Sequence, residues 1–121
     1  MPFHIRLVAL GNPKRLHPFL SEINGRGDSG AFSLNCAIPT PMPVPADDIR
    51  AWRRSHWGSP HDAYNATVKV VDEWQIVIAF DCQERPYNAL YTLMARHGYL
   101  SYHLECKAIK DMRKPDFKAA A

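Results

Sequence analysis

One stretch of the sequence decides the fold class: Tyr64-Asn65-Ala66-Thr67-Val68-Lys69-Val70-Val71-Asp72-Glu73-Trp74-Gln75-Ile76-Val77-Ile78-Ala79-Phe80-Asp81. Both halves are rich in β-branched residues, and a short polar turn around Asp72-Glu73 separates them. Two such runs joined by a tight turn predict an antiparallel β-hairpin over residues 64–81.

A strand, a helix and a second strand are predicted on the N-terminal side of this hairpin. Residues 3–10 alternate between apolar and polar, as in a strand with one buried face. Asn12 can cap a helix that starts at Pro13, because its apolar residues follow at helical spacing: Leu16, Phe19, Leu20 and Ile23. After the glycine-rich run 25–30, residues 31–35 read as another strand.

A helix and a final strand are predicted on the C-terminal side. Pro86 opens a helix with Leu90, Leu93 and Met94 on one face, and residues 99–106 alternate again. This order of elements predicts an α+β fold. Specifically, we expect a ferredoxin-like βαββαβ sandwich, with an antiparallel sheet that carries two helices on one face.

An inserted helix interrupts this pattern at about residues 39–62. Four prolines lie between positions 39 and 45, so this part can form neither a helix nor an interior strand. Asp47 and Asp48 then suit a helix N-terminus, and Gly58-Ser59-Pro60 ends the helix. The insert is therefore predicted as an extended connector followed by one tryptophan-rich helix.

Composition favours one soluble globular domain. The chain has 121 residues, of which 46% are hydrophobic and 22% charged, and no apolar run approaches the ~20 residues of a membrane span. We expect a single domain over residues 1–106, a basic flexible tail over 107–121, and a cytoplasmic location. The three cysteines are odd in number and form no CxxC pair, so neither a disulfide framework nor a zinc knuckle is predicted. A formal charge of +3 permits nucleic acid as a partner without implying it.

Several short motifs resemble one known family. They are Ile38-Pro39-Thr40-Pro41, Trp52 through Trp57-Gly58-Ser59, Asp62-Ala63-Tyr64, and Ile78-Ala79-Phe80-Asp81 before the Pro86 helix. Together they resemble the YubB-type ferredoxin-like domain family over about Leu7 to Cys106. The loop Cys82-Gln83-Glu84-Arg85-Pro86 departs from the family pattern, in which a tryptophan and a pair of prolines are common. The resemblance implies a small protein of a plasmid, prophage or genomic island.

The favoured function is a non-enzymatic protein-binding module. In the setting that the resemblance implies, a host defence complex such as a CRISPR effector is an expected protein partner, and this chain its inhibitor. Interfaces favour tryptophan, tyrosine and arginine, which are concentrated in and just after the insert helix. The expected partner-binding residues are Arg50, Arg53, Arg54, Trp57, His61, Asp62 and Tyr64. No catalytic residue, metal or cofactor is predicted.

Two alternatives remain. A ferredoxin-like sheet can bind nucleic acid by base stacking, although no strand here has the RNP1 pattern. A small metal-dependent enzyme is the other, since His56 and His61 flank a turn that Asp62 follows. The same turn also suits a structural role, in which Trp57 fills the core and Asp62 accepts hydrogen bonds from turn amides. We favour that structural interpretation over a metal site.

Overall fold

The computed structural model of this chain describes residues 2–23, 32–41 and 46–109. Its strands are β1 (Phe3–Leu10), β2 (Tyr64–Asp72), β3 (Gln75–Cys82) and β4 (Ser101–Ala108). Its helices are α1 (Pro13–Ile23), the short 3-10 helix η1 (Leu34–Cys36), α2 (Ala46–Trp57) and α3 (Tyr87–Arg96). The prediction of an α+β fold is confirmed.

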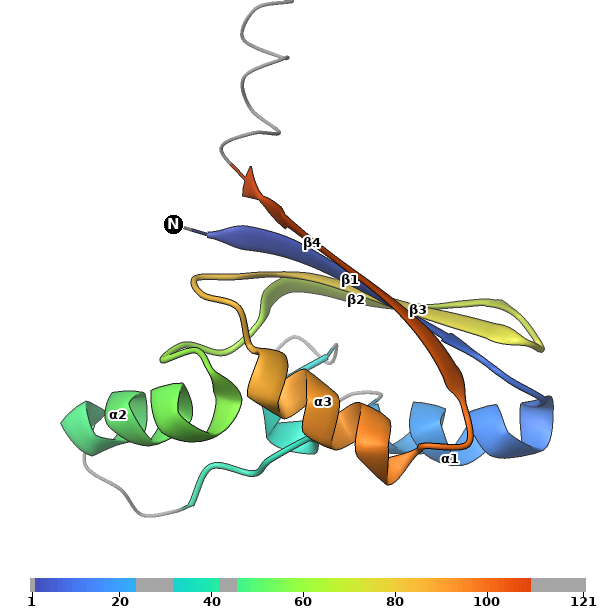
Figure 1. The fold of residues 1–121 in the computed structure, drawn as a ribbon, viewed down its shortest axis with the longest axis horizontal. Coiled ribbons are helices and arrows are strands. Elements are labelled where there is room, and N and C mark those ends of the chain that lie inside the picture. The colour runs from blue at the N-terminus through green and yellow to red at the C-terminus, as the bar shows by residue number, and fades with distance from the viewer. Residues whose placement is uncertain (1, 24–31, 42–45, 110–121) are drawn as a thin grey trace, which may run out of the picture.

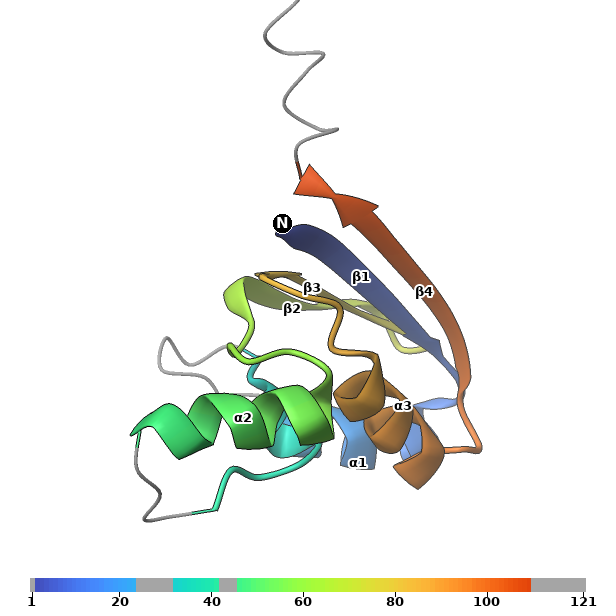
Figure 2. The same ribbon diagram turned by 60° about the vertical axis from the view of Figure 1, so that its left-hand side comes forward.

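The strands form one antiparallel sheet in the order β2-β3-β1-β4. The hairpin predicted from residues 64–81 is therefore present, and it places β2 at one edge of the sheet and β4 at the other. All three α-helices lie on the same side of the sheet, with α1 and α2 at opposite ends of the helical layer (Figure 1). The turned view shows the same two layers, with the strands curving over the helices (Figure 2).

The core lies between these two layers. Alternate residues of β1 and β3 point toward the helices and have almost no exposed surface, which is the period-2 pattern expected of a half-buried strand. The apolar stripe of α1 meets them as predicted, and the cap is also confirmed, because the side-chain oxygen of Asn12 accepts a hydrogen bond from Arg15 N–H at 3.1 Å. The core residues on these three elements include Ile5, Leu7, Leu16, Phe19, Ile23, Ile76, Ile78 and Phe80.

The strand predicted at residues 31–35 is wrong. Ser33 is extended, but its side chain then caps the 3-10 turn of η1 by accepting a hydrogen bond from Asn35 N–H at 3.2 Å. Phe32 and Leu34 are both buried. The alternation of apolar and polar residues that predicted a strand here therefore arises from a loop whose apolar side chains pack in the core. Residue 31 and the glycine-rich run lie outside the described residues.

The last strand has the predicted length of eight residues but begins and ends two residues later than predicted. β4 extends to Ala108, and Ile109 N–H donates to Pro2 O at 3.1 Å, so the ordered sheet passes the boundary expected at residue 106. The remainder of the predicted tail, 110–121, lies outside the described residues, as do residues 42–45 of the proline-rich connector.

Candidate functional site: the outward face of the insert helix

The C-terminal end of α2 is fixed to the body by Trp57. Its side chain has no exposed surface, and its indole N–H donates to Ile38 O at 2.8 Å. Gly58 follows with a positive φ of 91°, and a Cβ at this position would lie 2.8 Å from Arg85 O in the loop before α3. Only glycine tolerates both the backbone conformation and this close approach. The prediction that Trp57 contacts a partner is therefore wrong, because its side chain belongs to the core.

Asp62 fixes the loop that connects α2 to β2. One carboxylate oxygen accepts hydrogen bonds from Leu34 N–H at 2.8 Å and Ala63 N–H at 2.7 Å, and the other accepts one from the Ser33 hydroxyl at 2.5 Å. The two hydrogen bonds from Ser33 and Leu34 join the loop to η1, which is 28 residues earlier in the chain. Asp62, predicted as a partner contact, is thus a structural residue, in agreement with the structural interpretation of this turn.

Arg53 also faces the body. Its guanidinium lies 4.7 Å from the centroid of the Trp57 ring, and its Nε donates to the Thr40 hydroxyl at 3.4 Å. A cation over an indole face is attracted by the ring quadrupole, an interaction worth about 0.5–2 kcal/mol. Thr40 is itself held by the side-chain oxygen of Asn35, through its hydroxyl at 2.7 Å and its N–H at 2.9 Å. Arg53 therefore stabilises the connector before α2.

Arg50 and Arg54 are the exposed arginines of α2. They lie four residues apart on one face of α2, and both are exposed, Arg54 with 66% of its side chain accessible. The Nε of Arg54 lies 3.5 Å from Oε2 of Glu84, beyond strong hydrogen-bonding distance. The Glu84 side chain is half exposed, but this oxygen is itself buried and accepts no hydrogen bond from the described residues. His61 is exposed too, and Tyr64 has 37% of its surface accessible. Four of the seven predicted partner residues are therefore exposed: Arg50, Arg54, His61 and Tyr64.

The histidines near this helix do not converge. The His56 ring stacks on Trp52 at 4.3 Å, and its Nδ1 lies 2.8 Å from Trp52 O. Both Asp62 carboxylate oxygens are occupied by the hydrogen bonds described above. Within residues 2–23, 32–41 and 46–109, no three histidine, cysteine or acidic side chains are grouped as a metal site requires. Nothing in this geometry favours the metal-dependent alternative.

A polar cluster that the sequence did not indicate lies on the open face of the sheet. His4 Nδ1 is 2.8 Å from one oxygen of Asp81, and the amide of Asn65 donates to the other at 3.0 Å. Asn65 has a positive φ of 51°, at an irregularity in the pairing of β2 with β3. The left-handed conformation of Asn65 directs its side chain to Asp81, so this cluster has a structural explanation. The three residues come from β1, β2 and β3, which are far apart in the sequence, so no local sequence pattern predicts that they meet.

Two basic side chains flank one carboxylate on this open face. Arg6 lies 4.0 Å from Glu105, and His103 Nε2 lies 3.1 Å from the same carboxylate. Val8 and Val77, which pair in the middle of this face, are buried beneath their longer neighbours. The face therefore presents paired charges and no row of stacking aromatics among the described residues, so it does not favour the nucleic-acid alternative.

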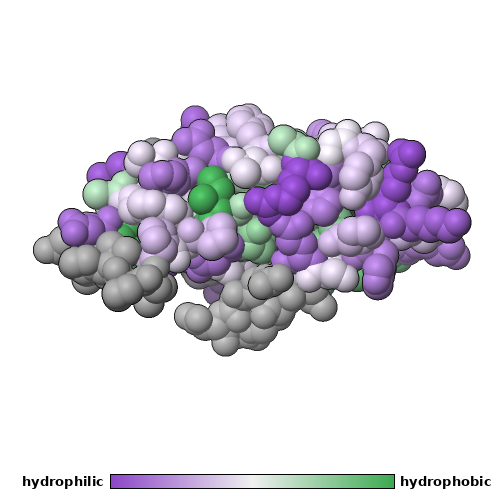
Figure 3. All heavy atoms as spheres, turned by 90° about the horizontal axis from the view of Figure 1, so that it is seen from below, coloured by the Kyte–Doolittle hydropathy of each residue, from purple (hydrophilic) through white to green (hydrophobic). Residues whose placement is uncertain are grey.

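The helical side of the molecule is mostly hydrophilic, and apolar atoms reach its surface only in small separate areas (Figure 3). None of the described helices is long and apolar enough to cross a bilayer. Comparison of the chain with protein-family models, with curated proteins and with solved structures gives no match. The resemblance to the YubB-type family stays a prediction.

Proposed function

We propose that this chain is a non-enzymatic protein-binding module that engages its partner through the outward face of α2. The observation that carries the proposal is the division of this helix into two faces. Arg53 and Trp57 contact the body, whereas Arg50 and Arg54 are exposed four residues apart. A guanidinium presented by a helix that is already fixed loses less conformational freedom on binding, and arginine is among the residues that contribute most to interfaces.

The partner surface that fits this face is acidic. Two guanidinium groups on one helix face can each bind a carboxylate in a bidentate manner. The intramolecular partner of Arg54, Glu84, is half exposed and can be displaced at small cost, because exposed ion pairs contribute about 0–1 kcal/mol. We therefore expect a protein with aspartate or glutamate side chains at the contact.

The finer fold assignment belongs to this proposal. Without η1 and α2, the chain order is β1-α1-β2-β3-α3-β4, and the strand order β2-β3-β1-β4 supports a ferredoxin-like domain with α2 as an insert. That assignment supports the resemblance to the YubB-type family. On the basis of this resemblance, we propose that the chain is a cytoplasmic protein of a mobile genetic element and that it inhibits a host defence complex, such as a CRISPR effector.

The test is affinity capture from a nuclease-treated lysate that contains host defence complexes, with bound proteins quantified by mass spectrometry. The double variant Arg50→Glu/Arg54→Glu should reduce capture of a stoichiometric effector subunit at least tenfold. The matched control is Lys14→Glu/Arg15→Glu, which makes the same charge change on exposed residues of α1, at the other end of the helical layer. The control should capture as the wild type does.

Equal capture by both variants would contradict the proposal, provided that their unfolding midpoints match. If the wild type captures proteins from an untreated lysate but not from the nuclease-treated one, nucleic acid is favoured as the partner. The nuclease step therefore separates the two classes of binding.

A further inference from the structure

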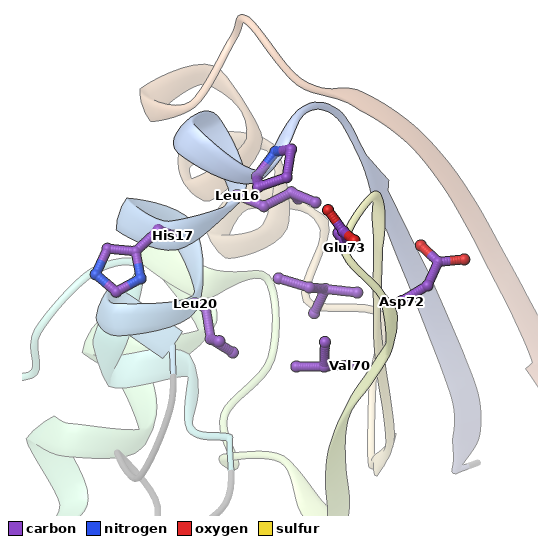
Figure 4. A pocket seen from close by; sticks show the side chains of 8 residues that line it. Leu16, His17, Leu20, Val70, Asp72 and Glu73 are labelled. Atoms are coloured by element: carbon purple, nitrogen blue, oxygen red, sulfur yellow. The ribbon is translucent and has the colours of Figure 1, made fainter.

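A groove opens between α1 and the β2–β3 hairpin. Leu16 and Leu20 point from α1 toward Val70 of β2, which lies across the groove from them (Figure 4). Pro13 and Ile76 complete the apolar part of the lining. The groove has a volume of about 140 Å³, similar to the ~150 Å³ cavity that accepts one benzene molecule, so it has room for one aliphatic side chain.

Val70 is the unusual member of this lining. It pairs with Ile76 and so points to the helical side of the sheet, where the same position on an interior strand would be buried. Instead, 54% of its surface is accessible. Exposing a valine of this kind forgoes a hydrophobic gain of order 1 kcal/mol. The groove therefore has a binding surface that the described residues leave uncovered.

The backbone of β2 is open beside the groove. β2 is an edge strand that pairs with β3 alone among the described residues, so about half of its N–H and C=O groups point outward. Natural edges are usually short or shielded by charges. β2 has nine residues, and between its two pairing irregularities Lys69 is the charged residue. Such an edge can accept another strand.

The charges around the edge indicate which charged residues an added strand would need. Lys69 pairs with Val77, so it points to the open face, away from the groove. Glu73 lies at the turn end of the groove, and the lining contains Asp72 and Glu73 as anions against a single histidine, His17. A residue directly opposite Lys69 would favour an acidic side chain, and one near Glu73 a basic side chain.

We propose that the β2 edge binds an extended segment of a partner protein by strand addition, with an apolar side chain entering the groove opposite Val70. The segment alternates apolar residues on the groove side with an acidic residue opposite Lys69, and it carries a basic residue toward Glu73. Main-chain hydrogen bonds supply affinity, and the groove and the two charges supply specificity.

A second copy of this chain meets a charge repulsion in one register on this edge. An antiparallel pair of β2 strands centred on Lys69 is the register that places Val68 of each copy opposite Val70 of the other. The same register sets the two Lys69 side chains directly opposite each other, which is destabilising. A foreign segment with an acidic residue at this position has no such repulsion.

The test uses a fluorescein-labelled peptide. Its eight central residues alternate isoleucine and threonine, with glutamate in place of one central threonine. One arginine is added at each end, so that either strand direction can place a basic residue near Glu73. Binding to the full chain is followed by fluorescence anisotropy. Val70→Lys should weaken binding about tenfold or more, because it removes an apolar contact and adds charge to the groove. Val71→Lys is the matched control, because Val71 is the next residue of β2, is 46% exposed and lies outside the groove lining. It should change the dissociation constant less than threefold.

A second peptide, with lysine in place of the glutamate, should bind several-fold more weakly because it repels Lys69. No binding of the first peptide to the wild-type chain, or equal weakening by Val70→Lys and Val71→Lys, would overturn the proposal. Self-association of the wild type in sedimentation that Val70→Lys abolishes would overturn it in favour of a second copy. Arg50→Glu/Arg54→Glu should leave peptide binding unchanged, so this proposal and the function proposed for α2 can fail independently.

Discussion

Tyr102 shows how a single partly buried hydroxyl makes stability depend on pH. The hydroxyl donates to His97 O at 2.8 Å, beside Phe19 in the core. Burial, with a smaller contribution from the neighbouring Tyr99, raises the pKa of Tyr102 to about 12, from the usual 10. The folded state therefore holds this proton more tightly than the unfolded chain does.

The sign of the effect follows from that difference. Below pH 10 both states keep the proton, and the full contribution of Tyr102 is present. As pH rises from 10 to about 12, the unfolded chain ionises first, so this contribution is lost. Tyr102→Phe should cost about 1 kcal/mol near pH 8, and its unfolding free energy should approach that of the wild type as pH rises above 10. Urea titrations of both proteins from pH 8 to 11.5 measure this, and parallel pH curves would contradict it.

Residue types alone could not divide the predicted site into its two groups. The helical period places Arg50, Arg53, Arg54 and Trp57 close together on α2, but which side faces the body depends on Ile38 O and Arg85 O. Both of these groups come from other parts of the chain. The sequence thus predicted the helix, whereas the assignment of each side chain to the core or the surface required the tertiary contacts.

At the scale of elements, three helical segments are joined through Arg96 at the end of α3. Its guanidinium donates to Cys36 O at 3.0 Å and to Ala37 O, both at the end of η1, and it pairs with Glu22 of α1. The other carboxylate oxygen of Glu22 lies 2.6 Å from His97 Nε2. Burial, and then the charge of Arg96, lower the pKa of His97. Because a carboxylate oxygen can only accept, Nε2–H of His97 donates to Glu22.

Replacing Arg96 should separate the effect of shape from that of charge. Arg96→Met should cost about 2 kcal/mol, because it removes charged hydrogen bonds to two carbonyl groups. Arg96→Lys keeps the charge but loses the planar fork, so it should cost about 1 kcal/mol. The control Arg54→Met removes another helical arginine that pairs with a glutamate, and it should cost at most about 1 kcal/mol, because it loses one long ion pair and no hydrogen bond to a carbonyl group. Urea unfolding gives all three values, and equal losses for Arg96→Met and Arg54→Met would contradict this role.

Element prediction succeeded where periodicity and end signals agreed. In α1 the apolar stripe coincides with the Asn12 cap and Pro13, and in the 64–81 hairpin two β-branched runs coincide with a turn. The segment 31–35 had alternation alone. Its conformation depends on Asp62, which receives the Leu34 N–H and the Ser33 hydroxyl. A contact of that sequence separation has no local signature.

At the scale of the whole molecule, the cysteines report how the domain opens. Cys82 is fully buried on β3, where burial raises the pKa of its thiol, and its sulfur lies 3.3 Å from the Ser59 hydroxyl. Cys36, at the end of η1, is nearly buried. Cys106 on the edge strand β4 is partly exposed. The three thiols thus lie in three different places: the core, the η1 segment and the edge of the sheet.

A thiol-reactive dye should therefore show one fast and two slow reactions with the native protein. Cys106→Ser should remove the fast phase. If β1–β4 and the helical layer unfold as one cooperative unit, Cys36 and Cys82 should react at the same slow rate, because both need the same global opening. Rates that differ by more than tenfold, measured in single-cysteine variants of equal stability, would show that the η1 layer opens separately.

The two faces of α2 also bear on how this chain can change over generations. The groups that hold the helix in place, such as the Trp57 indole and the Gly58 backbone, are directed inward. Within the part of the chain that the structure describes, the side chains of Arg50 and Arg54 add one ion pair to that attachment, between Arg54 and Glu84. Substitutions at Arg50 therefore carry little folding penalty, whereas those at Arg54 also remove the ion-pair partner of a buried Glu84 oxygen. Selection can change the exposed side chains of α2 with less risk to folding than the inward groups that hold the helix.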